Sequence, residues 1–253
     1  MNKLFLTGKT GSIGRNIDFA ENLEIDLTHT YKQILLKVDE LPKKSTLLHL
    51  AGITDHKMIE KDPQLSRQVN VSGSLSLFKA FEANGGKRFI FASTGHVYGN
   101  SDSKKVDPNS PTKPLTEYAK QKLETETMLL NYAQQSSVEL IILRIFSIFG
   151  PGMSKHYLAS RVFESISTQQ YTPIRNSNDI RDFMDLSNLV EDIKKVVELK
   201  RYNAILNICS GSEISIRSKI LSIDPDWPLD LFDESNSDLP FLAGVRDPIL
   251  DSL

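Results

Sequence analysis

The sequence predicts an α/β fold with a doubly wound parallel sheet and helices on both faces. Two observations lead to this prediction: short apolar runs recur along the 253-residue chain, and longer segments with helical spacing of apolar residues lie between them. Unbroken apolar runs suit strands that are covered on both faces. Their alternation with helices favours a parallel sheet, whose ligand crevice lies at the carboxyl ends of the strands.

Each element is predicted from its own pattern. The predicted strands, which lack polar alternation, are 3–7, 45–52, 88–94, 139–146 and 204–211. The predicted helices, with apolar residues at i, i+3 and i+4, are 63–84, 114–135, 157–169 and 186–199. Asp62 and Pro63 are a start signal for the first helix. The segments 99–114 and 172–179, rich in Pro, Ser and Asn, are typical of long loops.

Composition excludes several classes of function. Thirty basic and thirty-two acidic residues are interspersed and leave a net charge of -2, so we expect no nucleic-acid or anionic-membrane partner. Cys209 is the single cysteine and the five histidines show no ligand spacing, so no metal site is expected. No apolar run approaches the roughly 18 residues that span a bilayer. We expect a cytoplasmic protein.

A glycine-rich loop, "LFLTGKTGSIGR" at 4–15, follows the first predicted strand. Gly8, Gly11 and Gly14 allow a tight turn whose amides meet a pyrophosphate at the start of the next helix. A P-loop ending in "GKT" would instead need glycine at position 3, where the chain has Lys3. The loop therefore predicts a dinucleotide site, with an ordinary glycine turn as the alternative.

An ordered series of motifs follows this loop. They are "TGKTGSIG" at 7–14, "HLAG" at 49–52, "NVSGSLSLFKA" at 70–80, "FASTGHVYG" at 91–99, "YAKQKLETE" at 118–126, "LRIFSIFGPG" at 143–152, "DIRDFMDLSNLVEDI" at 179–193 and "NICSGSEISI" at 207–216. Together they resemble the extended short-chain dehydrogenase/reductase family, the NAD(P)-dependent nucleotide-sugar epimerases, dehydratases and ketoreductases. The resemblance covers about residues 1–216.

The resemblance implies a Rossmann-type dinucleotide-binding domain at 1–165, completed by a strand near 204–208. Residues 166–253 are then mostly a small, abbreviated substrate lobe that is interleaved with the first domain. The stretch 15–25 is short for the helix and second strand that the family usually places there. Because this region normally contacts the adenosine ribose, NAD and NADP both remain possible as the cofactor.

Tyr118 and Lys122 stand four residues apart in "TEYAKQK", a spacing that puts both side chains on one helix face. The resemblance implies that Tyr118 is the catalytic acid or base, and that Lys122 stabilises its ionised form and holds the nicotinamide ribose. Ionising a phenol near neutrality takes about three pKa units, or about 4 kcal/mol. Thr94 matches the family's catalytic Ser/Thr. The alternative is a solvated helix face and a strand-end threonine.

Further positions carry over by the same resemblance. The expected cofactor-binding residues are Gly8, Gly11, Ser12, Ile13, Gly14, Asp26, Leu27, Ala51, Gly52, Asn70, Tyr118 and Lys122. Within this set, Asp26 and Leu27 match an acidic dipeptide that touches adenine, although Asp26 also suits an ordinary surface. Asn70 matches a helix asparagine beside the cofactor.

The expected substrate-binding residues are Thr94, His96, Ser147 and Arg181. Arg181 matches an arginine that contacts the substrate diphosphate, for which a guanidinium is well suited. Ser147 replaces an asparagine that contacts the sugar in many epimerases. His96 is either an extra proton donor or a loop histidine, and Arg246 is a possible second phosphate contact.

Other residues are expected to be structural. His49 is predicted to be a buried histidine with its hydrogen bonds satisfied. Arg144 is expected to have a structural role, and Cys209 is expected to pack after a strand.

Gly95 and His96 stand where dehydratases of the family carry Asp and Glu, so 4,6-dehydration is not expected. The leading hypothesis is an NAD(P)-dependent enzyme acting at C4 of a nucleotide-activated sugar, with reduction slightly favoured over epimerisation because "GKTG" is similar to the loop of 4-keto-6-deoxysugar reductases. The alternative is a dinucleotide-binding scaffold or sensor without catalysis.

The resemblance also implies a homodimer through the segments 63–84 and 114–135. Leu75, Phe78, Leu129 and Tyr132 are candidates for its apolar contact area, although core packing accounts for the same residues.

Overall fold

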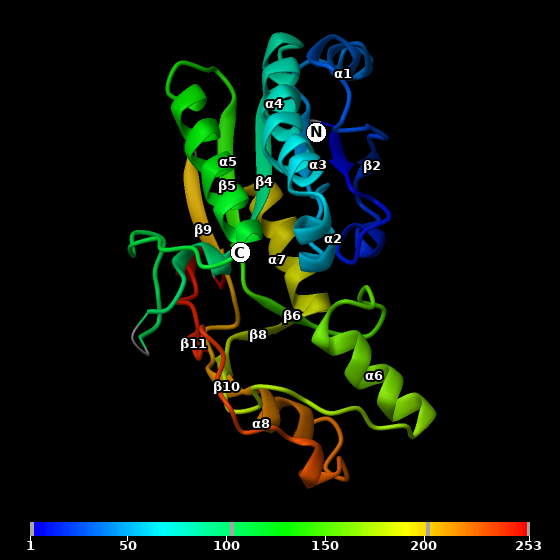
Figure 1. The fold of residues 1–253 in the computed structure, drawn as a ribbon. Coiled ribbons are helices and arrows are strands. Elements are labelled where there is room, and N and C mark those ends of the chain that lie inside the picture. Colours follow the sequence, from blue (N-terminus) through cyan, green and yellow to red (C-terminus); the bar gives the residue numbers. More distant parts are fainter. Residues whose placement is uncertain (1–2, 102–103, 201–202, 252–253) are drawn as a thin grey trace. The chain divides into compact units, whose positions relative to one another are not determined.

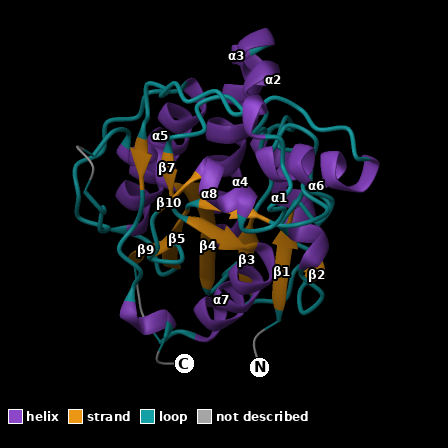
Figure 2. Ribbon diagram, turned by 90° about the horizontal axis from the view of Figure 1, so that it is seen from below, coloured by secondary structure: helices purple, strands orange, loops and turns teal. Residues whose placement is uncertain are grey.

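The computed structural model describes residues 3–101, 104–200 and 203–251. Its main feature is a six-stranded sheet with the order β2-β1-β3-β4-β5-β9, whose strands lie side by side in Figure 2. They are β1 (Leu4–Thr7), β2 (Glu21–Asn22), β3 (Thr46–His49), β4 (Arg88–Thr94), β5 (Glu139–Ile145) and β9 (Ala204–Ile208). β1 pairs in parallel with β2 and β3, and β3 pairs in parallel with β4. The predicted α/β class with a parallel sheet is confirmed.

The helices are labelled in Figure 1. They are α1 (Tyr31–Val38), α2 (His56–Lys61), α3 (Pro63–Arg67), α4 (Ser74–Ala83), α5 (Glu117–Ala133), α6 (Leu158–Thr168), α7 (Leu186–Glu198) and α8 (Ile216–Leu221). Short 3₁₀ turns occupy Gly14–Asn16, Gly95–Tyr98, Leu229–Leu231 and Pro248–Leu250. The predicted segments 63–84, 114–135, 157–169 and 186–199 are all helical, whereas α1, α2 and α8 were not predicted.

Capping decides where two of these helices begin. The Asp62 side chain accepts a hydrogen bond from the Leu65 amide (2.9 Å), and Pro63 fills the first helical position. α5 begins three residues later than predicted because the Thr116 hydroxyl caps the Ala119 amide at 3.2 Å. Both starts therefore follow from side chains that replace missing backbone partners.

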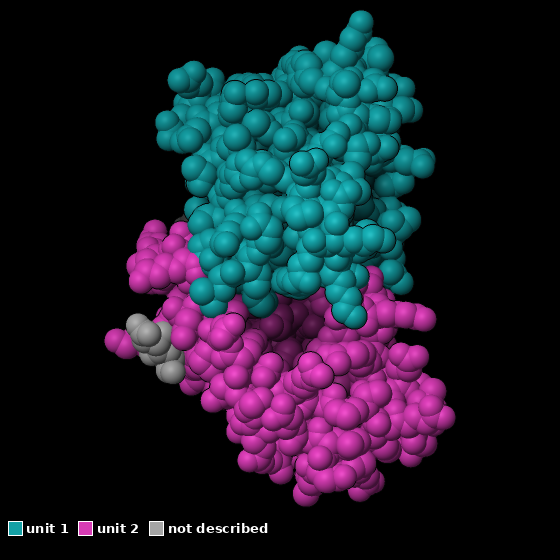
Figure 3. Space-filling view, viewed as in Figure 1, with its two compact units in different colours: residues 1–97, 114–144, 196–206 teal, residues 98–113, 145–195, 207–253 magenta. Residues whose placement is uncertain are grey.

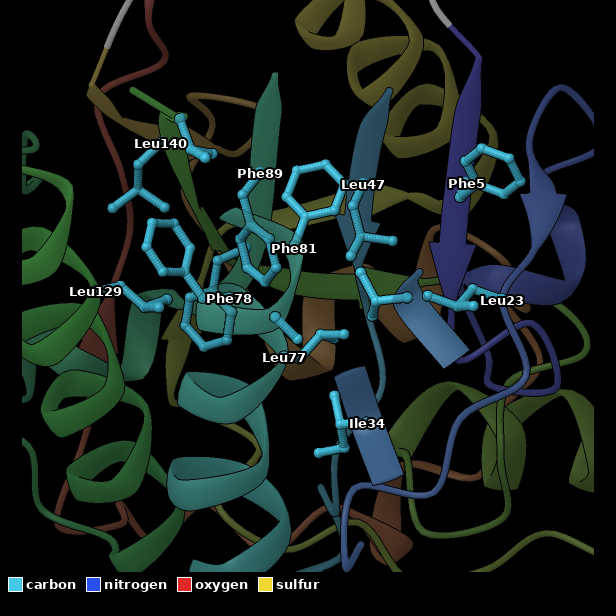
Figure 4. Packing of buried hydrophobic residues seen from close by; sticks show 14 of the residues in the cluster. Phe5, Leu23, Ile34, Leu47, Leu77, Phe78, Phe81, Phe89, Leu129 and Leu140 are labelled. Carbon is cyan, nitrogen blue, oxygen red and sulfur yellow. The ribbon is translucent and has the colours of Figure 1, made fainter. Parts of the chain in front are cut away.

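The hydrophobic core of the sheet lies between its strands and the helices α1, α4 and α5 (Figure 4). Phe78 and Phe81 of α4 meet Phe89 of β4 edge-on, with ring centroids 5.2 and 6.0 Å apart. Phe78 and Leu129 are both fully buried in this cluster. Of the apolar residues proposed for a dimer contact, these two are therefore core residues.

The short stretch after the glycine loop contains reduced forms of both elements that the family usually places there. A single 3₁₀ turn, Gly14–Asn16, replaces a full helix, and β2 has two residues. The chain then passes through α1 to β3, on the other side of β1. The strand order therefore changes direction at β1, which in such sheets marks the ligand crevice.

The chain divides into two compact units, coloured separately in Figure 3. The first comprises residues 1–97, 114–144 and 196–206, and the second comprises 98–113, 145–195 and 207–253. The second unit contains a small sheet of β10 (Ile214–Ser215), β7 (Ile180–Arg181) and β11 (Phe241–Leu242), and a parallel pair of β6 (Ser147–Phe149) and β8 (Phe183–Asp185). Among the described residues, no helix is long and apolar enough to cross a membrane.

Candidate active site

The glycine loop leaves β1 at the point where the strand order reverses. Gly8 has φ of +78°, and a Cβ there would lie 2.7 Å from the Ala51 amide nitrogen. A Cβ on Gly14 would lie 2.2 Å from the Gly8 carbonyl oxygen. Since a side chain at either position would collide with backbone, the tight turn of the loop requires glycine at both. Such a turn after a first parallel strand suits a pyrophosphate. These residues fit a dinucleotide.

Ser12 and Ile13 occupy the end of the same loop. Ser12 is buried, and its carbonyl accepts a hydrogen bond from the Asn16 side chain at 2.8 Å. Ile13 directly precedes the 3₁₀ turn, and the Gly11 amide donates to the Gly8 carbonyl at 3.0 Å. The predicted residues of the loop are thus held in one turn by backbone hydrogen bonds.

The two cations of the loop bind back onto it. Lys9 Nζ donates to the Ile17 carbonyl. Arg15 donates through Nε to the Gly11 carbonyl and through Nη2 to the Thr10 carbonyl, both at 3.2 Å. Arg15 is exposed, so water competes for these bonds and the guanidinium is able to exchange them for a phosphate.

Asn70 lies in a π-helical turn, Gln68–Gly73, that joins α3 to α4. Its amide nitrogen donates to the Ile53 carbonyl and to Gln121 Oε1, both at 2.9 Å, and its Oδ1 accepts from the Ile53 amide at 2.8 Å. Asn70 therefore fixes the turn that follows β3. π-helical turns often occur at functional sites.

Gly52 lies between this turn and α5. A Cβ at Gly52 would lie 3.0 Å from Asn70 Oδ1 and 3.7 Å from Lys122 Nζ. Gly52, Asn70 and Lys122 were predicted from three separate motifs, and the structure places them side by side.

His49, at the end of β3, is fully buried and is bonded on both ring nitrogens. Thr7 Oγ1 lies 2.7 Å from Nδ1, and Ser74 Oγ lies 2.9 Å from Nε2. Ser74 Oγ donates to the Asn70 carbonyl at 2.8 Å, so it accepts from Nε2, which carries the ring proton, and the Thr7 hydroxyl donates to Nδ1. Burial, reinforced by the charge of Lys122, lowers the pKa of His49 to about 3. The prediction of a satisfied buried histidine is confirmed.

Lys122 has a buried ammonium group. Nζ donates to the Ala92 carbonyl at 2.7 Å and lies 4.7 Å from the centroid of the Phe91 ring. Burial lowers the pKa of Lys122 to about 8, and the negative charge of Glu126 acts in the opposite direction. Among buried lysines, such values are associated with functional sites.

Tyr118 is half-buried at the first turn of α5. Lys122 Nζ lies 5.9 Å from the centroid of its ring. The ring of His56 meets it edge-on, with centroids 5.9 Å apart and an interplanar angle of 71°. His56 was not predicted as a site residue. The sequence did contain a start signal for its helix: Asp55 caps α2 by accepting a hydrogen bond from the Lys57 amide at 2.9 Å.

Thr94 is the last residue of β4, and its hydroxyl accepts a hydrogen bond from the His96 amide at 3.2 Å. The parallel strands deliver Thr94 and the Ala51–Gly52 turn to the same edge of the sheet. The first unit therefore contains Thr94, His96, Tyr118 and Lys122 together with the glycine loop.

Asp26 and Leu27 differ in exposure: the Asp26 side chain faces solvent and the Leu27 side chain lies in the core. Asp26 is exposed, and its Oδ1 accepts from the Thr28 amide (2.8 Å) and hydroxyl (2.7 Å). These hydrogen bonds lower the pKa of Asp26. The Leu27 side chain is buried in the core, so only its backbone is left to meet a ligand. A contact of either residue with adenine stays a prediction.

Ser147 and Arg181 belong to the second unit. Ser147 begins β6 and is half-buried. Arg181 Nη2 pairs with Asp179 Oδ2 at 2.9 Å, and Nη1 donates to the Ile180 carbonyl at 2.8 Å. Burial lowers the pKa of Arg181, while Asp179 opposes that effect. Their substrate contacts remain predictions.

Two residues of the second unit are occupied by structural contacts. Arg246 binds Asp192 through both terminal nitrogens (2.7 and 2.9 Å), Asp251 through Nε (2.7 Å) and the Cys209 carbonyl (2.8 Å). These contacts give Arg246 a structural role, and a phosphate contact of its side chain stays a prediction. Cys209 is buried, as expected, and burial raises the pKa of its thiol to about 12.

No three His, Cys, Asp or Glu side chains within residues 3–101, 104–200 and 203–251 are grouped so as to hold a metal ion. The groups that the first unit's candidate site brings together are a phenol, an ammonium, a hydroxyl and an imidazole.

The profile of the NAD-dependent epimerase/dehydratase family matches residues 21–209. The chain belongs to this family. Members of this epimerase/dehydratase family are NAD(P)-dependent enzymes, so this chain is an enzyme of the same kind. The matched residues begin after the glycine loop, whose assignment therefore rests on its place after β1.

Two curated relatives of this chain carry names for different reactions on nucleotide sugars. It is 26% identical to a GDP-6-deoxy-D-mannose reductase of Pseudomonas aeruginosa, covering 86% of this chain and 78% of the relative. It is 27% identical to a UDP-glucose 4-epimerase of Vibrio cholerae, covering 89% and 77% respectively.

A solved structure supports the same fold. RMD from Pseudomonas aeruginosa, complexed with NADPH, superimposes with a TM-score of 0.82 at 23% identity, covering 99% of this chain and 92% of the other.

Proposed function

We propose that the protein is an NAD(P)-dependent oxidoreductase that acts at C4 of a nucleotide-activated sugar, as a 4-ketoreductase in preference to a 4-epimerase. The observation that carries this proposal is the grouping of Thr94, Tyr118 and Lys122 in one unit with the glycine loop. The named relatives support the substrate class, since both act on nucleotide sugars by their printed names.

Each residue has a task in this chemistry. NAD(P), when bound, supplies or accepts the hydride. In reduction, the Tyr118 hydroxyl donates a proton to the oxygen on C4 as that carbon becomes an alcohol. In epimerisation, Tyr118 first takes the hydroxyl proton and later returns it. Thr94 steadies the same oxygen, and the positive charge of Lys122 favours the ionised phenol.

The residues after Thr94 argue against dehydration. Elimination of water from the sugar needs a second acid and base, which Gly95 cannot provide and for which His96 is a single candidate. The Thr94 hydroxyl oxygen already accepts a hydrogen bond from the His96 amide. A simple hydride and proton transfer therefore suits the site better than elimination.

Cofactor stoichiometry distinguishes the two leading reactions. The purified protein is incubated with reduced cofactor and 4-keto-6-deoxy sugars linked to GDP, dTDP or UDP, and separately with UDP-glucose and oxidised cofactor. A reductase consumes one reduced cofactor per product, whereas an epimerase forms product with no net change in cofactor. Net epimerisation of UDP-glucose would contradict the preference for reduction.

A second candidate is a dinucleotide-binding scaffold or sensor without turnover. It is motivated by the three-residue turn Gly14–Asn16 and by the exposure of Asp26, which leave little wall around the adenosine end. Cofactor binding by calorimetry together with no turnover on the whole sugar panel would favour it. Turnover that depends on Tyr118 would exclude it.

A further inference from the structure

Glu126 is a buried carboxylate on α5, one turn after Lys122. It accepts a hydrogen bond from the Ser93 hydroxyl. It also accepts from Arg144, through Nη2 at 2.8 Å and Nε at 3.2 Å to Oε2. Both ends of the ion pair are buried, with 1% of the Glu126 side chain and 5% of the Arg144 side chain exposed.

These contacts join three elements. Ser93 is on β4, directly before Thr94, and Arg144 is on β5. Glu126 itself is on α5, which carries Tyr118 and Lys122. A buried charge is tolerated only when it is paired and hydrogen-bonded, so the position of α5 against β4 and β5 is tightly constrained at this point. The expected structural role of Arg144 is confirmed.

The carboxylate also acts on Lys122 through space. Positions i and i+4 of a helix are neighbours, and in a buried environment the attraction between opposite charges is weakly screened. The groups that face Glu126 are Ser93 from β4, Arg144 from β5 and Lys122 from its own helix.

Lys122 faces a different set of groups. They are the Ala92 carbonyl and the Phe91 ring from β4, the ring of Tyr118, and His49 of β3, which is neutral at neutral pH. Glu126 is therefore the negative charge that favours the ammonium form of Lys122, and Arg144 partly offsets it.

We propose that Glu126 is a positioning residue of the site: it fixes the strand of Thr94 against the helix of Tyr118 and Lys122, and its charge keeps Lys122 in the ammonium form. This inference rests on the proposed function, because it assigns Glu126 a task in a reaction that uses Tyr118 and Lys122.

Three variants separate the charge from the hydrogen bonds. Glu126→Gln removes the charge but keeps the shape, and leaves the Arg144 charge unpaired. Glu126→Gln combined with Arg144→Gln removes both charges, so no buried charge is left unpaired. Ser93→Ala removes the bond to β4 and keeps the ion pair. Circular dichroism and urea unfolding show which variants are folded.

The first readout is independent of turnover. Lysines are labelled with ¹³C, and the titration of the Lys122 Cε resonance is followed by NMR, with Lys122→Met identifying the signal. In Glu126→Gln its midpoint is expected to fall by one pH unit or more. It should fall by less in the double variant, because the opposing charge of Arg144 is also removed, and stay unchanged in Ser93→Ala. If Glu126→Gln or, should that variant not fold, the double variant leaves Lys122 titrating as in the wild type, the charge role is wrong.

The second readout is the pH dependence of kcat. Glu126→Gln is expected to lose about eightfold or more at pH 8.5 but less than threefold at pH 6.5, with partial recovery at pH 8.5 in the double variant. An equal loss at every pH would show a merely structural role and overturn the proposal. A wild type that turns over no nucleotide sugar would instead count against the proposed function, and the NMR titration would still test Glu126.

Discussion

Tyr118 is the residue on which the proposed chemistry depends most directly. Replacing it with phenylalanine removes the proton donor and leaves the ring contacts with His56 and Lys122 available. We expect Tyr118→Phe to lower kcat by about a hundredfold or more, since general acid–base catalysis contributes about 10²–10⁴-fold, with little change in cofactor affinity. Steady-state kinetics and calorimetry measure the two quantities. Retention of most of the activity would remove Tyr118 from the mechanism.

Lys122 combines function with a cost in stability, because its ammonium is buried. We expect Lys122→Met to abolish turnover and weaken cofactor binding, and yet to raise the melting temperature at pH 7, since an apolar side chain replaces a buried charge. The exposed Lys120 on the same helix offers a matched control. Lys120→Met should leave turnover, cofactor binding and the melting temperature unchanged. A variant that loses turnover but binds cofactor normally would contradict the dual role.

The direction of the pH effect follows from the same burial. Burial lowers the pKa of Lys122 from 10.5 to about 8. Between these values the unfolded chain binds a proton that the folded chain does not, so the Lys122 contribution makes the free energy of unfolding rise with pH from about 8 to 10.5. It is lost as the pH falls back through 8. Urea unfolding at several pH values should show this rise in the wild type and Lys120→Met, and its absence in Lys122→Met.

Five strands of the sheet were predictable because their residues are covered on both faces, whereas the exposed two-residue β2 was not. The runs at 4–7, 46–49, 88–94, 139–145 and 204–208 are apolar and mostly buried, and their sequence pattern alone located them. α1 escaped prediction although its start signal is in the sequence. Thr30 and Gln33 form a capping box, in which the Thr30 amide (3.0 Å) and hydroxyl (2.8 Å) both donate to Gln33 Oε1.

The strands of the second unit were not predictable in the same way. β6, β7, β8, β10 and β11 have two or three residues each, which is too short for any alternation to be recognised. Their pairing depends on contacts between distant segments, such as Ile180 opposite Phe241. For the same reason the sequence did not reveal that His56 would meet Tyr118, because that contact joins α2 and α5.

His49 connects three elements through Thr7 of β1 and Ser74 of α4. Its pKa is lowered to about 3 by burial, so between pH 3 and 6.5 the unfolded chain binds a proton that the folded chain does not. Its contribution to stability is fully present above 6.5 and is lost as the pH falls towards 3, by about 1.4 kcal/mol per pH unit.

Urea unfolding between pH 4 and 7 tests this contribution. The pH dependence of the unfolding free energy should be shallower by about one proton in His49→Gln than in the wild type. His29→Gln, at an exposed histidine, is the control and should keep most of the wild-type slope. Equal slopes for His49→Gln and the wild type would show that His49 is already protonated in the folded protein.

At the scale of the whole molecule, the reduced wall around the adenosine end should weaken cofactor binding. The 3₁₀ turn Gly14–Asn16 and the two residues of β2 replace a helix and a longer strand. Losing two or three hydrogen bonds at roughly 1 kcal/mol each implies a cofactor affinity about thirty to a hundredfold below that of a relative with the longer helix and strand. We therefore expect binding in the high micromolar range and poor discrimination between NAD and NADP.

Calorimetric titration with both cofactors measures this directly. Lys9 and Arg15, which now bind loop carbonyls, are the cations that would favour NADP by exchanging those contacts for its 2′-phosphate. Lys9→Met and Arg15→Met should then reduce any preference for NADP. Submicromolar affinity for either cofactor would show that another part of the chain has replaced the missing wall.

The division of the chain has a consequence for its synthesis. The first unit is assembled from residues 1–97, 114–144 and 196–206, so its last strand, β9, emerges from the ribosome long after β5. Until then β5, seven residues of largely apolar sequence, remains an unpaired edge of the growing sheet. Such edges recruit other chains. A nascent or truncated chain that stops between the two strands is therefore expected to aggregate rather than to persist as a smaller folded protein.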